Sequence, residues 1–346
     1  MDAIVDNIRR GDRRSLARAM SLVDGVSDTS QALKDHLRRS TGKVPWWGFT
    51  GPPGVGKSTL IDALVDMLRR RGKRVGVVAI DPTSPLSDGA LLGDRVRMMR
   101  HAEDGDVFIR SLATHHREGG LSDATIHCAR LLELADYDPV LIETVGVGQN
   151  EVDVAPLADV CTVILAPGFG DDIQLTKAGL LEIADCVVVN KCDLPGSNRL
   201  LKEIHRELGG LPTAALAYEK DTKVDRAGDA AESTTDAVEI FGIEAKSGKN
   251  VEELLDTLFE MDAAARTPDE RRRRNERRVL SEIRRGATVE YRRALEGELS
   301  GDGMAELLDT LQRGECSVES AVAQLVTKAA DRVRQPEVSE NDREPK

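Results

Sequence analysis

The feature that most constrains this chain is a glycine-rich stretch between an apolar segment and a helical pattern. Residues 44–49 are apolar and predict a buried strand, and residues 60–65 predict the start of a helix. Between them, residues 51–58 read Gly-Pro-Pro-Gly-Val-Gly-Lys-Ser and fit G-x-x-x-x-G-K-[ST], the phosphate-binding P-loop. Glycines let the backbone curl so that its N–H groups point at phosphate oxygens. The sequence therefore predicts a helix whose N-terminus faces an anion.

The side chains of this loop carry the predicted chemistry. Lys57 is placed to reach the β- and γ-phosphates, and the hydroxyl of Ser58 is placed to bind Mg²⁺. An ordinary glycine-rich turn is the alternative, and the strand before it and the helix after it disfavour that reading. The residues predicted to bind nucleotide here are Gly51, Pro52, Pro53, Gly54, Val55, Gly56, Lys57, Ser58 and Thr59.

Apolar, β-rich runs alternate with helical patterns from residue 44 to residue 261. This alternation predicts an α/β fold in which a doubly wound, mostly parallel sheet is covered by helices on both faces. Ligands then bind at the carboxyl ends of the strands. The predicted strands are 44–49, 74–80, 107–111, 140–143, 160–166, 187–190 and 238–243, and the predicted helices lie near 58–71, 121–135, 173–183, 197–208 and 250–261.

Composition narrows the class of protein. The 346 residues are 40% hydrophobic and 31% charged, as in a globular protein, and the net charge of −12 argues against nucleic-acid binding. No apolar run approaches the length of a membrane span and no signal peptide is recognisable, so we expect a cytoplasmic protein that binds no membrane. The five cysteines are scattered, which favours reduced core thiols over disulfides or a metal cluster.

A second nucleotide motif follows a later apolar strand. Asn190-Lys191-Cys192-Asp193 fits N-K-x-D, the guanine-reading motif of GTPases. The Asp193 carboxylate can accept hydrogen bonds from guanine N1–H and from the exocyclic amine, whereas adenine offers no such pair of donors. A mismatched base would leave the carboxylate unpaired. The stem of Lys191 can lie along the base, and Asn190 can tie this loop to the P-loop. The motif therefore favours GTP over ATP.

A third loop follows the last predicted strand. Glu244, Ala245 and Lys246 stand where GTPases usually place Ser-Ala-x, which supports the base through backbone N–H groups. Glu244 replaces the usual serine, and Ala245 still permits a close approach of the backbone. We therefore predict that these three residues bind nucleotide.

Acidic residues at successive strand ends predict the magnesium site. Asp81 follows the strand at 74–80, Asp94 lies in the run Leu-Gly-Asp-Arg-Val-Arg-Met, and Glu143 stands where GTPases carry D-x-x-G. Gly146 would then sense the γ-phosphate through its N–H. For each acid alone a helix cap, a turn or a surface charge is about as good a reading, and their shared placement favours the metal. The predicted metal ligands are Ser58, Asp81, Asp94 and Glu143.

The residue that would orient the attacking water is not in its usual place. Ras-like enzymes carry a glutamine directly after that glycine. Here the position is Val147, and the nearest glutamine is Gln149. The sequence predicts slow intrinsic hydrolysis that is quickened when a partner completes the site. The predicted catalytic residues are Lys57, Glu143 and Gln149.

Beyond residue 261 the strand signal vanishes. Helices with one apolar face, attached to a complete domain, predict dimerisation or packing against the first 40 residues. In the arginine-rich run 271–278, a solvated helix face is favoured over an anionic partner because acids follow. The predicted segments are an N-terminal helical segment (1–43), a P-loop GTPase domain (44–261), a C-terminal helical dimerisation extension (262–335) and a disordered tail (336–346).

Taken in order, these motifs resemble one family, the methylmalonyl-CoA mutase-associated GTPases, which are also called arginine/ornithine transport kinases. The resemblance spans about residues 1–330. The segments that carry it are 51–59, 81–85, 92–98, 109–111, 119–122 and, above all, 143–151, which reads Glu-Thr-Val-Gly-Val-Gly-Gln-Asn-Glu. Residues 86–91, His115-His116 and 209–243 depart from the family pattern, and for the two histidines a solvent-facing loop is favoured over a metal site.

The resemblance implies a metal- and GTP-dependent chaperone for adenosylcobalamin-dependent acyl-CoA mutases, above all methylmalonyl-CoA mutase. Such a protein gates delivery of the cofactor and helps to remove inactivated cofactor, usually as a homodimer joined by helical extensions. GTP or GDP and Mg²⁺ are then the ligands, an adenosyltransferase is a further expected partner, and no cobalamin of the protein's own is expected.

Other functions stay open at this point. One alternative is a protein kinase of a transport system, which the older family name suggests. The sequence contains no protein-kinase H-R-D or D-F-G element, which disfavours this alternative. Another alternative is a nickel-insertion metallochaperone GTPase. Proteins of that class carry a His-rich tract or Cys/His metal ligands, and this sequence has neither. A non-enzymatic scaffold requires that loss of Lys57 leaves function intact.

Overall fold

A computed structural model of the chain divides into two compact units, residues 1–277 and 278–346, and each is described here by itself. The structure describes residues 2–24, 28–38, 44–81, 99–101, 103–113, 123–144, 152–168, 179–208, 238–264, 267–300 and 302–334.

The first unit is built on a seven-stranded, fully parallel sheet with the strand order β3-β2-β4-β1-β5-β6-β7. All seven strands that the sequence predicts are present. The strands are β1 (Trp46–Thr50), β2 (Val75–Asp81), β3 (Val107–Ala113), β4 (Val140–Glu143), β5 (Val160–Leu165), β6 (Cys186–Val189) and β7 (Glu239–Gly242). The P-loop strand β1 lies at the centre, between β4 and β5, as a doubly wound fold requires.

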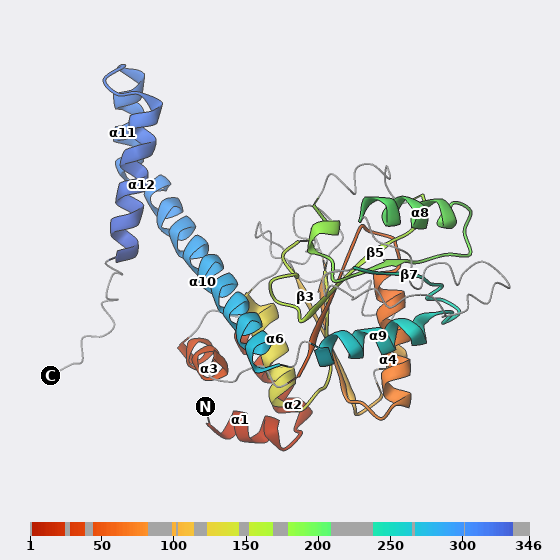
Figure 1. Ribbon diagram of the computed structural model, residues 1–346. Coiled ribbons are helices and arrows are strands. Elements are labelled where there is room, and N and C mark those ends of the chain that lie inside the picture. The colour runs from red at the N-terminus through yellow and green to blue at the C-terminus, as the bar shows by residue number, and fades with distance from the viewer. Residues whose placement is uncertain are drawn as a thin grey trace. The chain divides into compact units, whose positions relative to one another are not determined.

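Alternate residues of each strand enter different hydrophobic cores. Trp46 packs into one core and its neighbour Trp47 into the other, and both are fully buried. Because the strands are apolar on both faces, each face has to be covered by helices. Helices α4 (Lys57–Arg70) and α9 (Val251–Ala264) cover one face, and α2 (Arg13–Asp24) and α6 (Asp123–Leu134) lie on the other (Figure 1).

The N-terminal segment packs on the sheet through α6. Helices α1 (Asp2–Arg9) and α3 (Asp28–Arg38) flank α2, whose apolar positions Leu16, Ala19, Met20 and Val23 are buried. Helix α8 (Ser197–Glu207) covers β6 and β7 on the same face as α6, where Leu200, Leu201 and Ile204 complete a third cluster.

Some predicted segments lie outside the described residues. Of the predicted helix 173–183, the structure describes only a 3₁₀ turn, η3 (Leu181–Ile183). A second 3₁₀ turn, η1 (Met99–His101), follows the undescribed residues 82–98. Most of the segment 209–243, His115 and His116 also lie outside the description.

The second unit is helical throughout its described residues. It contains most of α10 (Pro268–Leu299), α11 (Asp302–Gln312) and α12 (Val318–Arg334). The hydroxyl of Tyr291 donates to the Val326 carbonyl (3.3 Å), and the small residues Ala294, Ala321 and Ala329 are buried. Four valines of α12 remain exposed, Val318, Val322, Val326 and Val333. Among the described residues, no helix is long and apolar enough to span a membrane.

Candidate nucleotide-binding site

The P-loop turns back on itself at two glycines whose place no other residue could take without strain. Gly51 directly follows β1 with φ +142°, and a Cβ there would lie 2.1 Å from the Ile164 carbonyl oxygen. Gly56 precedes α4 with φ +99°, and a Cβ there would lie 2.4 Å from Nδ2 of Asn190. Both the backbone angle and the close neighbours therefore require glycine. The N-terminus of α4 carries no side-chain cap, which fits a helix end that receives an anion.

Lys57 is held in place by the loop that it serves. Its Nζ donates to the carbonyl oxygens of Gly51 (2.7 Å) and Pro52 (3.0 Å), and the side chain is buried. These bonds orient the ammonium group across the mouth of the loop. A cation fixed in this position adds to the helix N-terminus in attracting phosphate.

Two of the four predicted metal ligands meet in the structure. The hydroxyl of Ser58, at the start of α4, donates to Oε1 of Glu143 at 2.7 Å, and both residues are buried. Glu143 ends β4 and pairs in register with Phe49 of β1, which brings the carboxylate to the P-loop. A hydroxyl and a carboxylate are hard oxygen ligands, so this donor set fits Mg²⁺.

The other predicted residues of the metal side are not all described. Asp81 ends β2 at the same edge of the sheet, but its side chain lies outside the description. Asp94, Gly146 and Gln149 lie outside the described residues altogether. The structure therefore brings Ser58 and Glu143 together, and all four metal-ligand assignments stay predictions.

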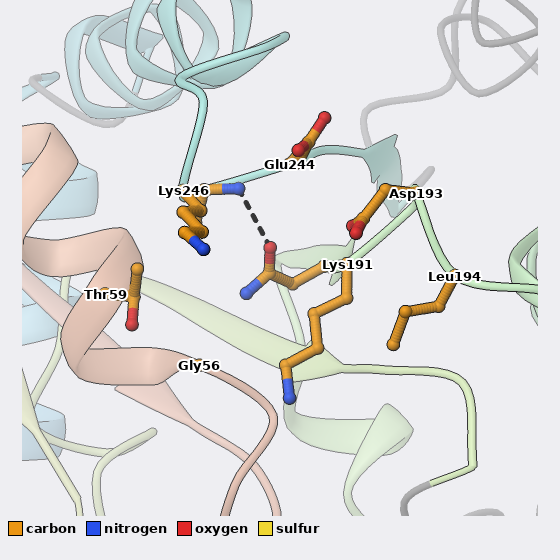
Figure 2. A pocket seen from close by; sticks show the side chains of 9 residues that line it. Gly56, Thr59, Lys191, Asp193, Leu194, Glu244 and Lys246 are labelled. Carbon is orange, nitrogen blue, oxygen red and sulfur yellow. Dashed lines mark hydrogen bonds between the residues drawn. The ribbon is translucent and has the colours of Figure 1, made fainter.

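A pocket of about 250 Å³ lies beside the P-loop (Figure 2). Its lining joins the first turn of α4 to the loops after β6 and β7. The lining residues are Gly56, Thr59, Asn190, Lys191, Asp193, Leu194, Glu244, Ala245 and Lys246. The two loops that the sequence predicts to contact the base therefore line the same pocket as the end of the P-loop.

Asn190 joins these three loops. Its Nδ2 donates to the carbonyl oxygen of Val55 (2.9 Å), which is the tie to the P-loop that the sequence predicts. Its Oδ1 accepts from the backbone N–H of Ala245 (3.0 Å), drawn as the dashed line in Figure 2. Lys191 adds a second tie, because its Nζ donates to the Gly54 carbonyl oxygen at 2.7 Å. The walls of this pocket and the P-loop are thus fixed relative to each other.

The remaining wall residues differ in exposure. Asp193 and Lys246 are exposed to the pocket opening, whereas Cys192 between the motif residues is buried. Burial raises the pKa of the Cys192 thiol to about 11, so this cysteine is a neutral packing residue rather than a reactive one. The backbone of Glu244 is held by an N–H···O bond to Lys249 (3.2 Å).

The family follows from a comparison with known proteins. Residues 16–294 match the family described as methylmalonyl-CoA mutase-associated GTPase MeaB. The chain belongs to this family. It is a P-loop GTPase of a family associated, as its description says, with methylmalonyl-CoA mutase.

Individual relatives agree with this assignment. A protein of Pyrococcus horikoshii that is named as a GTPase is 41% identical over 287 residues, which are 82% of this chain and 86% of that protein. A Mus musculus protein named methylmalonic aciduria type A homolog, mitochondrial, is 33% identical over 274 residues, 75% of this chain and 62% of that protein. The crystal structure of an LAO/AO transport system kinase is 22% identical with a TM-score of 0.66 over 94% of this chain and 96% of that chain, which shows a shared fold.

In this GTPase the sequence patterns missed three residues near the site. Leu194 lines the pocket directly after N-K-x-D, and its position next to the motif was the available signal. Thr144 donates through Oγ1 to Oγ1 of Thr50 at 2.9 Å, and its N–H donates to the Phe49 carbonyl oxygen at 3.0 Å. This pair locks the end of β4 to the end of β1, and no local sequence pattern reveals a contact between residues so far apart.

Proposed function

We propose that this GTPase is a chaperone that gates the loading of adenosylcobalamin into a methylmalonyl-CoA mutase-type enzyme and that helps to protect and reactivate that enzyme. The family match over residues 16–294 carries the proposal. The junction around Asn190 supports its nucleotide half, because a base pocket fixed to a phosphate loop is what a guanine nucleotide requires.

In this proposal, different residues bind the phosphates, the base and the metal ion. The backbone of residues 51–59 and the Lys57 ammonium hold the phosphates, and Asp193 accepts from the guanine edge while the loop at 244–246 faces the base. Ser58 and Glu143 hold Mg²⁺, with Asp81 and Asp94 as further ligands. When bound, Mg²⁺ neutralises charge on the β- and γ-phosphates.

Hydrolysis in this proposal is slow until a partner contributes. Lys57 stabilises the negative charge that develops on the transferred phosphoryl group, Glu143 would hold Mg²⁺, and Gln149 orients the attacking water. Loss of the γ-phosphate then releases the segment around Gly146 and changes the contact with the partner. Fast turnover of the isolated protein that survives Gln149→Ala would contradict this part.

The family description and the second unit support the partners in this proposal. An adenosylcobalamin-dependent acyl-CoA mutase is the client, and an adenosyltransferase is a further partner that supplies the cofactor. The exposed valines of α12 support a homodimer formed through the helical extension. We place the protein in the cytoplasm, with no cobalamin of its own and no nucleic-acid partner.

Transfer of the cofactor tests the chaperone role. Purified protein, apo-mutase, adenosylcobalamin and Mg²⁺ are mixed with GTP, GDP or a non-hydrolysable GTP analogue, and mutase activity is followed with time. We expect the rate of loading to depend on which nucleotide is present. Loading that is indifferent to the nucleotide would sink the chaperone proposal.

A change in base preference tests the proposed guanine-nucleotide binding separately from the chaperone role. Asp193→Asn replaces an acceptor by a donor, so it should weaken GTP binding about 100-fold and improve binding of xanthosine triphosphate, whose base carries a carbonyl in place of the amine. Calorimetry with Mg²⁺ measures both affinities. Asp309→Asn, an exposed aspartate of α11 that pairs with Arg313 at 3.0 Å, is the control and should leave both unchanged. Equal GTP affinity in the Asp193 variant would remove that residue from the site.

A further inference from the structure

The amino edge of the sheet, opposite the nucleotide pocket, carries a row of acids that the proposed function does not use. Asp159 directly precedes β5 and Asp185 directly precedes β6. Each of them closes the start of the neighbouring strand. Oδ2 of Asp159 accepts from the backbone N–H of Trp46 at 2.7 Å, and Oδ2 of Asp185 accepts from that of Cys161 at 2.7 Å.

The first turns of α10 bring an arginine to this edge. Arg274 Nη1 lies 3.6 Å from Oδ1 of Asp159, and only 17% and 12% of the two side chains are exposed. Glu270, one turn earlier, lies 3.5 Å from Nε of the same arginine and 3.1 Å from Nη2 of Arg277. The guanidinium therefore lies between a carboxylate of its own helix and a carboxylate of the sheet, in surroundings that water screens weakly.

Arg274 differs in this respect from its neighbours in the arginine-rich run. The side chain of Arg272 is 80% exposed and pairs with Glu276 one turn away at 2.9 Å, and Arg273 is similarly exposed. The solvated helix face that the sequence predicts is thus present for Arg272 and Arg273, whereas Arg278 at the end of the run is buried. Arg274 departs from it because Asp159, far away in sequence, lies at the edge where α10 begins.

The strand β1 connects this ion pair to the P-loop. Trp46, whose N–H is held by Asp159, is the first residue of β1, and Gly51 of the P-loop directly follows its last residue. β1 is the central strand and is buried along its whole length. Segment 152–158 packs tightly beneath it, because a Cβ on Gly48 would lie 2.6 Å from Val154. The buried strand β1 therefore has the P-loop at one end and the Asp159–Arg274 pair at the other.

We propose that Arg274 is a positioning residue that couples nucleotide occupancy to the docking of the first turns of α10. Opening of these turns would move the Arg274 guanidinium away from the mostly buried Asp159 carboxylate and would weaken the hydrogen bond that starts β1. A nucleotide that stabilises the P-loop end of β1 opposes that opening, and the docked helix in turn favours nucleotide binding. This inference rests on the proposed nucleotide binding.

Hydrogen exchange measured by mass spectrometry on the full chain tests the coupling. Peptides that cover residues 268–280 are followed with and without a GTP analogue and Mg²⁺, at a nucleotide concentration that saturates each variant. In the wild-type chain we expect the analogue to slow exchange in these peptides about fivefold, the lower end of typical allosteric coupling. Arg274→Gln should abolish the difference, and Asp159→Asn, which keeps an acceptor for Trp46, should do the same.

Further variants separate coupling from damage to the fold. Arg274→Lys keeps the charge and should restore part of the nucleotide effect. Arg272→Gln, on the exposed side of the helix, should retain all of it. The double variant Arg274→Gln/Asp159→Asn should lose no more than either single variant, because the two side chains act as one pair.

The outcomes distinguish this inference from the proposed function. If GTP binds but leaves exchange at 268–280 unchanged in the wild-type chain, or if Arg274→Gln keeps the full effect, the coupling is overturned and nucleotide binding stands. If calorimetry shows no guanine nucleotide binding at all, the proposed function fails first. A nucleotide effect that disappears in Arg274→Gln and Asp159→Asn but persists in Arg272→Gln supports the inference.

Discussion

The two edges of the central sheet hold charged side chains in different ways. At the carboxyl edge, Lys57 and Lys191 bond to backbone carbonyls of the loops around the pocket. At the amino edge, acids are paired with arginine side chains, as Arg69 is with Asp104 and Asp106 at 2.8 Å each. A cation that bonds to carbonyls keeps its net charge for an anionic ligand, whereas an ion pair is already neutral. The first edge is therefore built to bind and the second to hold the fold together.

The largest effect that this comparison predicts is on catalysis. Lys57→Ala removes a fixed cation from the transferred phosphoryl group, so the rate of GTP hydrolysis should fall about 100- to 1,000-fold with little change in thermal stability. Single-turnover hydrolysis and calorimetric unfolding measure the two quantities. Lys73→Ala is the matched control, because Lys73 pairs with Asp138 at the amino edge (3.4 Å). If the control lost as much activity, the division between the edges would be wrong.

Asn190 should be an exception to the division between a binding edge and a stabilising edge, because it should affect both ligand binding and stability. It is buried at the binding edge, yet its two hydrogen bonds hold three loops together. Asn190→Ala leaves the Val55 carbonyl and the Ala245 N–H without these partners, which should cost about 2–3 kcal/mol of stability and weaken GTP binding as well. Denaturant unfolding and calorimetry test both effects.

A serine in the neighbouring turn gives the control for Asn190. Ser197 Oγ donates to the Cys192 carbonyl oxygen (3.1 Å) without reaching the P-loop. Ser197→Ala should cost about 1 kcal/mol and leave GTP affinity unchanged. If Asn190→Ala lowered neither stability nor GTP affinity more than Ser197→Ala does, the contacts of Asn190 with the three loops would not be important for either property.

The binding edge could be predicted largely from the sequence, and the amino edge could not. The P-loop and N-K-x-D motifs are local patterns whose chemistry fixes their place at strand ends, so the seven strands and the contact from Asn190 to Val55 were predictable. The pair Arg274–Asp159 joins a helix to a strand start across more than a hundred residues. Periodicity marks which face of a helix is apolar, but it does not say which distant carboxylate an arginine will meet.

The same limit applies within the binding edge. Ser58 and Glu143 were predicted as separate ligands from separate motifs, and only the pairing of β1 with β4 brings them to 2.7 Å. Leu194 was missed because a leucine in a loop carries no chemical signal of its own, and only its place next to the N-K-x-D motif pointed to it. Tertiary packing, rather than local pattern, decides such contacts.

The acid dependence of stability sharpens the view of the amino edge. The hydrogen bond from Arg69 holds the pKa of Asp104 below its usual value. A lowered pKa in the folded state means that the contribution of Asp104 to stability is present above its unfolded pKa of about 3.9 and is lost as the pH falls through the folded value. About a third of this carboxylate is exposed, so water screens the pair.

Asp104→Asn should therefore destabilise the protein at pH 7 by only about 0.5–1 kcal/mol, and the difference from wild type should shrink as the pH falls below about 4. Urea unfolding at pH 7, 5 and 3.5 measures it. Glu203→Gln, which breaks an exposed pair with Arg199, is the control and should cost less. A difference that grew at low pH would have the opposite sign to this prediction.

The smallest expected effect is on thiol reactivity, and it compares the openness of the two edges directly. Burial raises the pKa of Cys192 at the binding edge to about 11, and burial raises the pKa of Cys161 at the amino edge further. At pH 8 a pKa of about 11 leaves about one thiolate in a thousand, so both should react slowly with iodoacetamide. Cys316, which is only half-buried, should react first.

Mass spectrometry of the labelled native chain gives the order of reaction. We expect Cys316 first, Cys192 next, and Cys161 only on unfolding, because the loop that carries Cys192 lines the pocket while Cys161 lies inside a central strand. GTP with Mg²⁺ should slow the labelling of Cys192 and leave that of Cys316 unchanged. Labelling of Cys161 before Cys192 would mean that the amino edge opens more readily than the edge that binds nucleotide, which reverses the comparison from which these predictions start.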